Sequence, residues 1–89
     1  MKTFRIKVSG KVQGVYYRQS TKQKALDLNL TGTVKNLPNG DVEIIASGES
    51  NEINLLIDWC KIGPSRAIVS NVQIEELPPK EFMDFVIVR

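Results

Sequence analysis

The sequence predicts an α+β sandwich in which two helices pack on one face of an antiparallel sheet. Five short segments have strand character, most clearly where apolar and polar residues alternate. Two longer segments instead place apolar residues at helical spacing. At 89 residues and 42% hydrophobic content, the chain is long enough for one domain, residues 1–89, with a single core.

The first half of the chain predicts a strand, a helix and a second strand. Alternation over residues 4–8 predicts the first strand, which ends at Ser9-Gly10. Helical periodicity then covers residues 19–28, and Asn29 can adopt the left-handed conformation that ends a helix. A short extended segment follows over residues 31–36.

The second half begins with a turn, because Asn39-Gly40 is a pair typical of tight hairpins. A third strand alternates over residues 42–48, and a second helix follows over residues 50–60 with Ser50 as its expected cap. Gly63-Pro64 ends this helix. The last two strands are expected at 67–75 and 85–88.

The order of these elements is β-α-β-β-α-β followed by a fifth strand. Right-handed crossovers and the central hairpin favour a sheet with both helices on one face. The predicted fold is therefore a ferredoxin-like α+β sandwich.

The segment Val12–Arg18 is the first candidate site, because it joins the first strand to the N-terminus of a helix. Backbone N–H groups at such a junction, together with the helix dipole, favour phosphate or carboxylate. Gly14 permits unusual dihedral angles, and Arg18 offers a planar fork suited to phosphate oxygens. A plain loop with one surface arginine is the alternative interpretation.

Charge is distributed unevenly, although the net charge is only +2. Seven of the twelve basic residues precede Asp27, the first acidic residue. This field would attract a small anion to the loop. The alternative is a solvated basic face that the fold neutralises with Glu43, Glu75 or Glu76.

Several kinds of chemistry are excluded by composition. The chain has no histidine and one cysteine, so imidazole triads, a disulfide framework and transition-metal clusters are not available. Cys60 and Arg66 have the C-x₅-R spacing of cysteine phosphatases. However, Cys60 is expected at the end of a helix and on its apolar stripe, so we interpret it as a core residue.

Asn36, at the end of the second expected strand, is the other polar residue of interest. Its amide could orient a water molecule beside a bound anion. Taken alone, the pattern favours a simpler interpretation, in which asparagine introduces the turn at Pro38-Asn39-Gly40.

Taken together, two motifs resemble those of the acylphosphatases, and the similarity extends over essentially the whole domain. The first motif is Gly10-x-Val12-Gln13-Gly14-Val15-x-Tyr17-Arg18-x-x-Thr21-x-x-x-Ala25-x-x-Leu28. The second is Gly32-x-Val34-x-Asn36-x-x-Asn39-Gly40-x-Val42-Glu43. Three positions depart from the family pattern: Tyr17 replaces a usual phenylalanine, Asn29 a usual glycine and Thr33 a common tryptophan.

This resemblance implies hydrolysis of acyl phosphates to a carboxylate and phosphate. By position, Arg18 would bind the phosphoryl group and Asn36 would position the attacking water. The backbone N–H groups of the loop would complete the phosphate cradle, which comprises Gln13, Gly14, Val15, Tyr16, Tyr17 and Arg18. No metal or cofactor is expected.

Two other functions are compatible with parts of this pattern. A non-catalytic phosphate-binding module on the same fold would keep the cradle without turnover. RNA-recognition modules share the element order but stack bases on strand aromatics, and residues 41–46 contain none. We therefore expect a small-molecule acyl phosphate as substrate, no nucleic-acid or membrane partner, and a monomer. No segment resembles a signal peptide, so a cytoplasmic location is expected.

Overall fold

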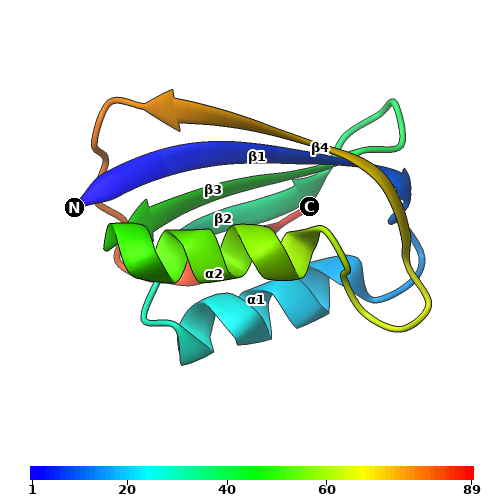
Figure 1. Cartoon of the computed structure of the whole chain (residues 1–89), viewed down its shortest axis with the longest axis horizontal. Helices are drawn as coiled ribbons and strands as arrows, with labels where there is room; N and C mark the ends of the chain where they lie inside the picture. Colours follow the sequence, from blue (N-terminus) through cyan, green and yellow to red (C-terminus); the bar gives the residue numbers. More distant parts are fainter.

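The computed structural model describes all 89 residues as a five-stranded sheet with both helices on one face (Figure 1). The predicted class and element order are confirmed. The first helix begins two residues earlier than expected, at Tyr17. The elements are β1 (Lys2–Lys11), α1 (Tyr17–Asp27), β2 (Thr31–Asn36), β3 (Val42–Gly48), α2 (Ser50–Cys60), β4 (Ile68–Leu77) and β5 (Phe85–Val88).

The strands lie in the order β4-β1-β3-β2-β5. Neighbours are antiparallel except β2 and β5, which are parallel, so the sheet is mixed rather than wholly antiparallel. The connection after β4 explains this difference. It crosses the end of the sheet where β4 finishes and β2 begins, and β5 therefore enters the opposite edge in the direction of β2 (Figure 1).

The core lies between the sheet and the two helices. Helix α1 packs on β2 and β5, and α2 packs on β1 and β3. In the centre, Ile6 pairs with Ile44, and Ile44 pairs with Val34; all three side chains are fully buried. Burial of each such side chain stabilises the fold by about 1.5–3 kcal/mol. These buried residues occupy apolar positions of the alternating pattern from which the strands were predicted.

The helix ends agree with expectation at one position and differ at another. Asn29 follows α1 with a positive φ of 59°, as predicted. Ser50 is not the cap of α2: its backbone is already helical, and Glu49 precedes it in an extended conformation without a side-chain cap bond. Neither helix is long and apolar enough to cross a membrane.

Candidate anion-binding pocket

The loop between β1 and α1 turns sharply through two residues with positive φ. Gly14 has a φ of 74° and Tyr16 a φ of 64°. Glycine adopts this region freely, whereas a side chain there costs roughly 1–2 kcal/mol. The buried side chains of Val12 and Val15 anchor the loop to the core. The surrounding packing thus holds Tyr16 in a strained conformation directly before the first residue of α1.

This turn leaves a set of backbone donors free. The N–H groups of Gln13, Gly14, Val15 and Tyr16 donate no hydrogen bond to a protein acceptor. They lie at the N-terminus of α1, where the helix dipole is positive, and the first turn of α1 has no acidic residue. Such an arrangement favours an anion.

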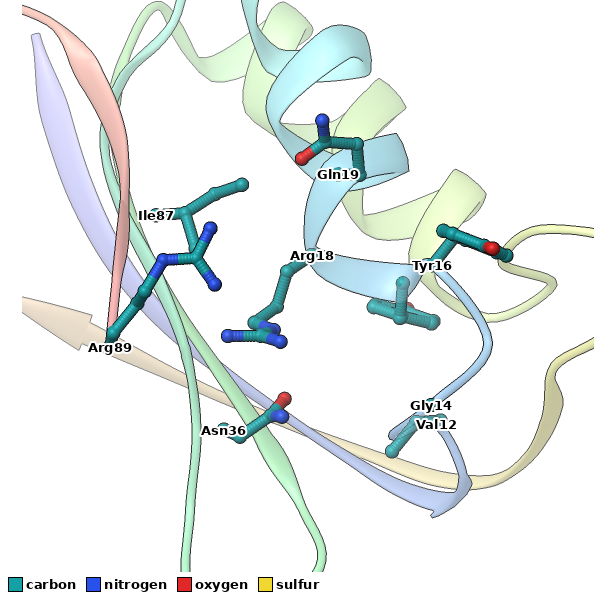
Figure 2. Close-up of a pocket in the computed structure, with 9 residues that line it drawn as sticks. Val12, Gly14, Tyr16, Arg18, Gln19, Asn36, Ile87 and Arg89 are labelled. Atoms are coloured by element: carbon teal, nitrogen blue, oxygen red, sulfur yellow. The ribbon is translucent and has the colours of Figure 1, made fainter.

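Arg18 lies in the first turn of α1, and its guanidinium group points across the pocket towards Asn36 (Figure 2). Arg18 forms no ion pair. Of the seven basic residues before Asp27, Arg5 alone does, with Glu43 at 2.8 Å and Glu75 at 3.8 Å. The neutralised basic face is therefore limited to Arg5, and the positive charge of Arg18 remains available to a ligand.

Asn36 is the last residue of β2. Its Oδ1 is the single buried side-chain oxygen or nitrogen without a hydrogen-bond partner. An unsatisfied buried polar atom typically costs about 1–3 kcal/mol. The adjacent turn closes without it, through the Leu37 N–H to the Asp41 carbonyl at 2.8 Å and the Asp41 N–H to Asn39 Oδ1 at 3.0 Å. The Asn36 side chain thus makes no hydrogen bond to the turn.

Arg18 and Asn36 line one pocket of about 560 Å³ (Figure 2). Three other residues of the predicted cradle also line it: Gly14, Tyr16 and Tyr17. Two do not, because Val15 is buried in the core and the side chain of Gln13 bonds to the β2–β3 turn. The complete lining is Val12, Gly14, Tyr16, Tyr17, Arg18, Gln19, Asn36, Ile87 and Arg89.

Three lining residues were not anticipated: Gln19, Ile87 and Arg89. Lys35 pairs with Val88 in the parallel register, which places Arg89 beside Asn36. The Arg89 guanidinium points into the pocket from the opposite side to Gly14 (Figure 2). No local pattern could have indicated this, because it depends on β5 joining the edge of β2. The side chains of the pocket therefore include two guanidinium groups and no carboxylate.

Tyr17 connects the two helices beneath the pocket. Its ring is 1% exposed and lies 5.5 Å from the ring of Trp59, and its hydroxyl donates to the carbonyl of Cys60 at 2.7 Å. The hydroxyl that the usual phenylalanine lacks thus has a partner. Burial raises the pKa of the Tyr17 phenol well above its usual range.

Cys60 is fully buried at the end of α2, which confirms that it is a core residue. Burial raises the pKa of its thiol to about 12. A nucleophilic cysteine requires the opposite shift and an accessible sulfur. The C-x₅-R spacing to the exposed Arg66 therefore has no catalytic meaning here.

Comparison with known proteins identifies the family. The acylphosphatase family model matches residues 4–87. An acylphosphatase of Marinobacter nauticus is 60% identical over 79 residues, covering 88% of this chain and 86% of that protein. The structure of an acylphosphatase from Coxiella burnetii is 47% identical, with a TM-score of 0.95 and coverage of 98% and 92% of the two chains.

A second solved structure matches from end to end. The acylphosphatase of Bacillus subtilis is 34% identical, has a TM-score of 0.96 and covers both chains completely. Sequence and fold therefore agree over nearly the whole length of the domain. This chain belongs to the acylphosphatase family, hydrolases that act on acyl phosphates.

Proposed function

We propose that Arg18 and the backbone N–H groups of Gln13–Arg18 bind the phosphoryl group of the acyl phosphate, and that Asn36 positions the attacking water. One observation carries this proposal above the others. A guanidinium without an ion pair and an amide oxygen without a hydrogen-bond partner line the same pocket. Each group needs a partner that the protein does not supply.

The cradle matches the charge of the reacting group. Phosphoryl transfer through a loose transition state spreads negative charge over three equatorial oxygens. The Arg18 fork can bond two of these oxygens, while backbone N–H groups at the start of α1 face the remaining charge. Donors held in place by the fold need little reorganisation when the charge develops.

The leaving group explains why this pocket needs no general acid. Cleavage of an acyl phosphate releases a carboxylate whose conjugate acid has a pKa of about 4, so no proton has to be delivered to it. Expulsion of an alkoxide from an ordinary monoester would require one. The side chains that line the pocket include no carboxylic acid and no imidazole, which suits the first reaction and not the second.

Asn36 supplies the remaining requirement, which is placement of the water. Its Oδ1 accepts a hydrogen from water and thereby aims a lone pair of the water oxygen at phosphorus. The new P–O bond forms as the P–O bond to the acyl group breaks, and the carboxylate leaves with the electron pair. A phosphoryl oxygen takes the water proton, because no side chain of the pocket is a base.

Two substitutions separate the roles in a benzoyl phosphate assay. Asn36→Ala should lower kcat about 100-fold or more while inhibition by inorganic phosphate stays nearly unchanged, because the cradle is intact. Arg18→Ala should weaken both turnover and phosphate inhibition, with kcat/KM lower by about 1,000-fold. The wild type should turn over in EDTA.

Asn71→Ala is the matched control, because Asn71 is exposed on β4 at the opposite edge of the sheet. It should behave as the wild type. Full activity of Asn36→Ala would exclude the water-positioning role. Unchanged phosphate inhibition in Arg18→Ala would exclude the phosphoryl-binding role.

A further inference from the structure

The side chain of Gln13 bonds outside the loop to which it belongs. Its Nε2 donates to the carbonyl oxygens of Leu37 and Asp41, each at 2.9 Å. Both hydrogens of one amide nitrogen are therefore used, and both partners lie in the β2–β3 turn. The two neighbours of Gln13, Val12 and Gly14, line the pocket. A single residue thus connects the cradle loop to the turn.

The two carbonyls flank the pair that contains Asn36. Asn36 pairs with Val42 at the end of the β2–β3 ladder, Leu37 follows Asn36, and Asp41 precedes Val42. The Leu37 N–H also donates to the Asp41 carbonyl at 2.8 Å. Gln13 therefore holds the base of the turn on both sides of the Asn36–Val42 pair.

Asn36 itself has no comparable restraint. Its Oδ1 has no hydrogen-bond partner, so its orientation depends on the backbone that carries it. That backbone is the end of a strand pair, where the chain leaves the ladder for a five-residue turn. A displacement of about 1 Å at a reacting group can lower a rate about 100-fold. The position of the turn therefore matters for the attacking water.

We propose that the Gln13 side chain is a positioning residue that fixes the separation between the phosphate cradle and Asn36. The inference rests on the role proposed above for Asn36. The backbone N–H of Gln13 belongs to the cradle, whereas its side-chain amide holds the turn. A change in the side chain therefore affects the Asn36 half of the site and leaves the anion-binding half in place.

Gln13→Met is the first variant, because it keeps the backbone N–H and the length of the side chain but removes both hydrogen bonds. We expect kcat to fall about 10- to 100-fold. The inhibition constant of inorganic phosphate should change by less than about threefold, since the cradle donors remain. Gln73→Met, at an exposed position of β4, is the matched control and should leave both values unchanged.

A double-mutant cycle shows whether Gln13 acts through Asn36. In the Asn36→Ala background, Gln13→Met should lower kcat by less than about twofold, because no amide remains to be positioned. Multiplicative losses would overturn the inference while leaving the role of Asn36 intact. An active Asn36→Ala protein would instead contradict the proposed function itself, so the two failures are distinguishable.

Gln13→Glu provides a pH readout and a second variant if Gln13→Met does not fold. An ionised carboxylate would face two carbonyl oxygens, whereas a protonated carboxyl can donate one hydrogen bond. The ratio of wild-type to variant kcat should therefore shrink as the pH falls. A ratio independent of pH, or a loss of phosphate inhibition equal to the loss of kcat, would overturn the positioning role.

Discussion

The two ends of the sheet differ in whether the protein supplies hydrogen-bond partners to the polar groups there. Where β1 begins, Thr3 and Ser47 are buried, and their hydroxyl oxygens lie 2.7 Å apart. They also hold the connection to β5: Ser47 Oγ donates to the Lys80 carbonyl at 2.7 Å, and the Lys80 N–H donates to Thr3 Oγ1 at 2.9 Å. Every one of these groups has a partner within the protein.

β1 ends on the far side of the sheet from its N-terminus (Figure 1), and there several polar groups of the pocket lack such partners. Asn36 Oδ1 is buried without a hydrogen bond, Arg18 has no ion pair, and the loop N–H groups donate to no protein acceptor. Since buried polar groups are usually satisfied, this contrast supports our proposal that the groups at the pocket end bind a ligand. Gln13 and Tyr17 are exceptions at the pocket end, because the Gln13 Nε2 donates both of its hydrogens to the turn and the Tyr17 hydroxyl donates to the Cys60 carbonyl.

Among the substitutions that test this comparison, we expect the largest effect from one that keeps the positive charge in the pocket but changes the shape of the group that carries it. Arg18→Lys keeps the positive charge but replaces a planar fork with a point charge. We expect kcat/KM for benzoyl phosphate to fall about 100-fold, with little change in the melting temperature. Arg66→Lys, at an exposed position outside the pocket, is the control. Near-wild-type activity of Arg18→Lys would show that charge alone is sufficient.

A substitution at the end of the sheet where β1 begins should change the stability of the protein and not its activity. Thr3→Val keeps the shape of the side chain but leaves the Lys80 N–H and the Ser47 hydroxyl with fewer partners. We expect the free energy of unfolding to fall by about 1–3 kcal/mol, measured in urea, with kcat/KM unchanged. Thr33→Val is the control, since its hydroxyl makes no hydrogen bond. A large loss of activity in Thr3→Val would mean that the two ends are coupled.

The smallest effect concerns Cys60, which is buried beneath the pocket end and takes no part in the proposed chemistry. In the unfolded chain its thiol ionises above a pH of about 8.5, whereas in the folded protein it stays neutral up to about 12. The folded state therefore binds more protons over this range, and stability falls as the pH rises, by at most about 1.4 kcal/mol per unit.

Unfolding free energies between pH 8 and 10.5 check this prediction. Cys60→Ser should retain catalysis and show a shallower decline, because serine does not ionise in that range. The raised pKa of Tyr17 contributes a further decline, which remains in both proteins. Identical slopes would contradict the buried-thiol assignment, and loss of turnover in a folded Cys60→Ser protein would implicate the sulfur in catalysis.

Local patterns were sufficient for much of the fold because they report short-range geometry. Alternation located the central strands, helical periodicity located α2 with Cys60 on its buried face, and Asn29 ended α1 as expected. The cap at Ser50 was wrong, because a favourable residue type does not determine where the helical backbone begins. Arg18 stood out from its loop and charge, whereas the local pattern at Asn36 favoured a turn residue and the family resemblance favoured a role in positioning water.

The sequence by itself determined the elements, the strand-to-helix loop with its arginine, and the absence of histidine that narrows the chemistry. Only the tertiary structure decided that β5 lies parallel to β2, that Arg89 therefore enters the pocket, and that Gln13 holds the turn beside Asn36. The physical reason is the separation along the chain between the residues that interact. Periodicity and turn residues reflect neighbours along the chain, whereas these contacts join segments 24 or more residues apart and exist only once the sheet has formed.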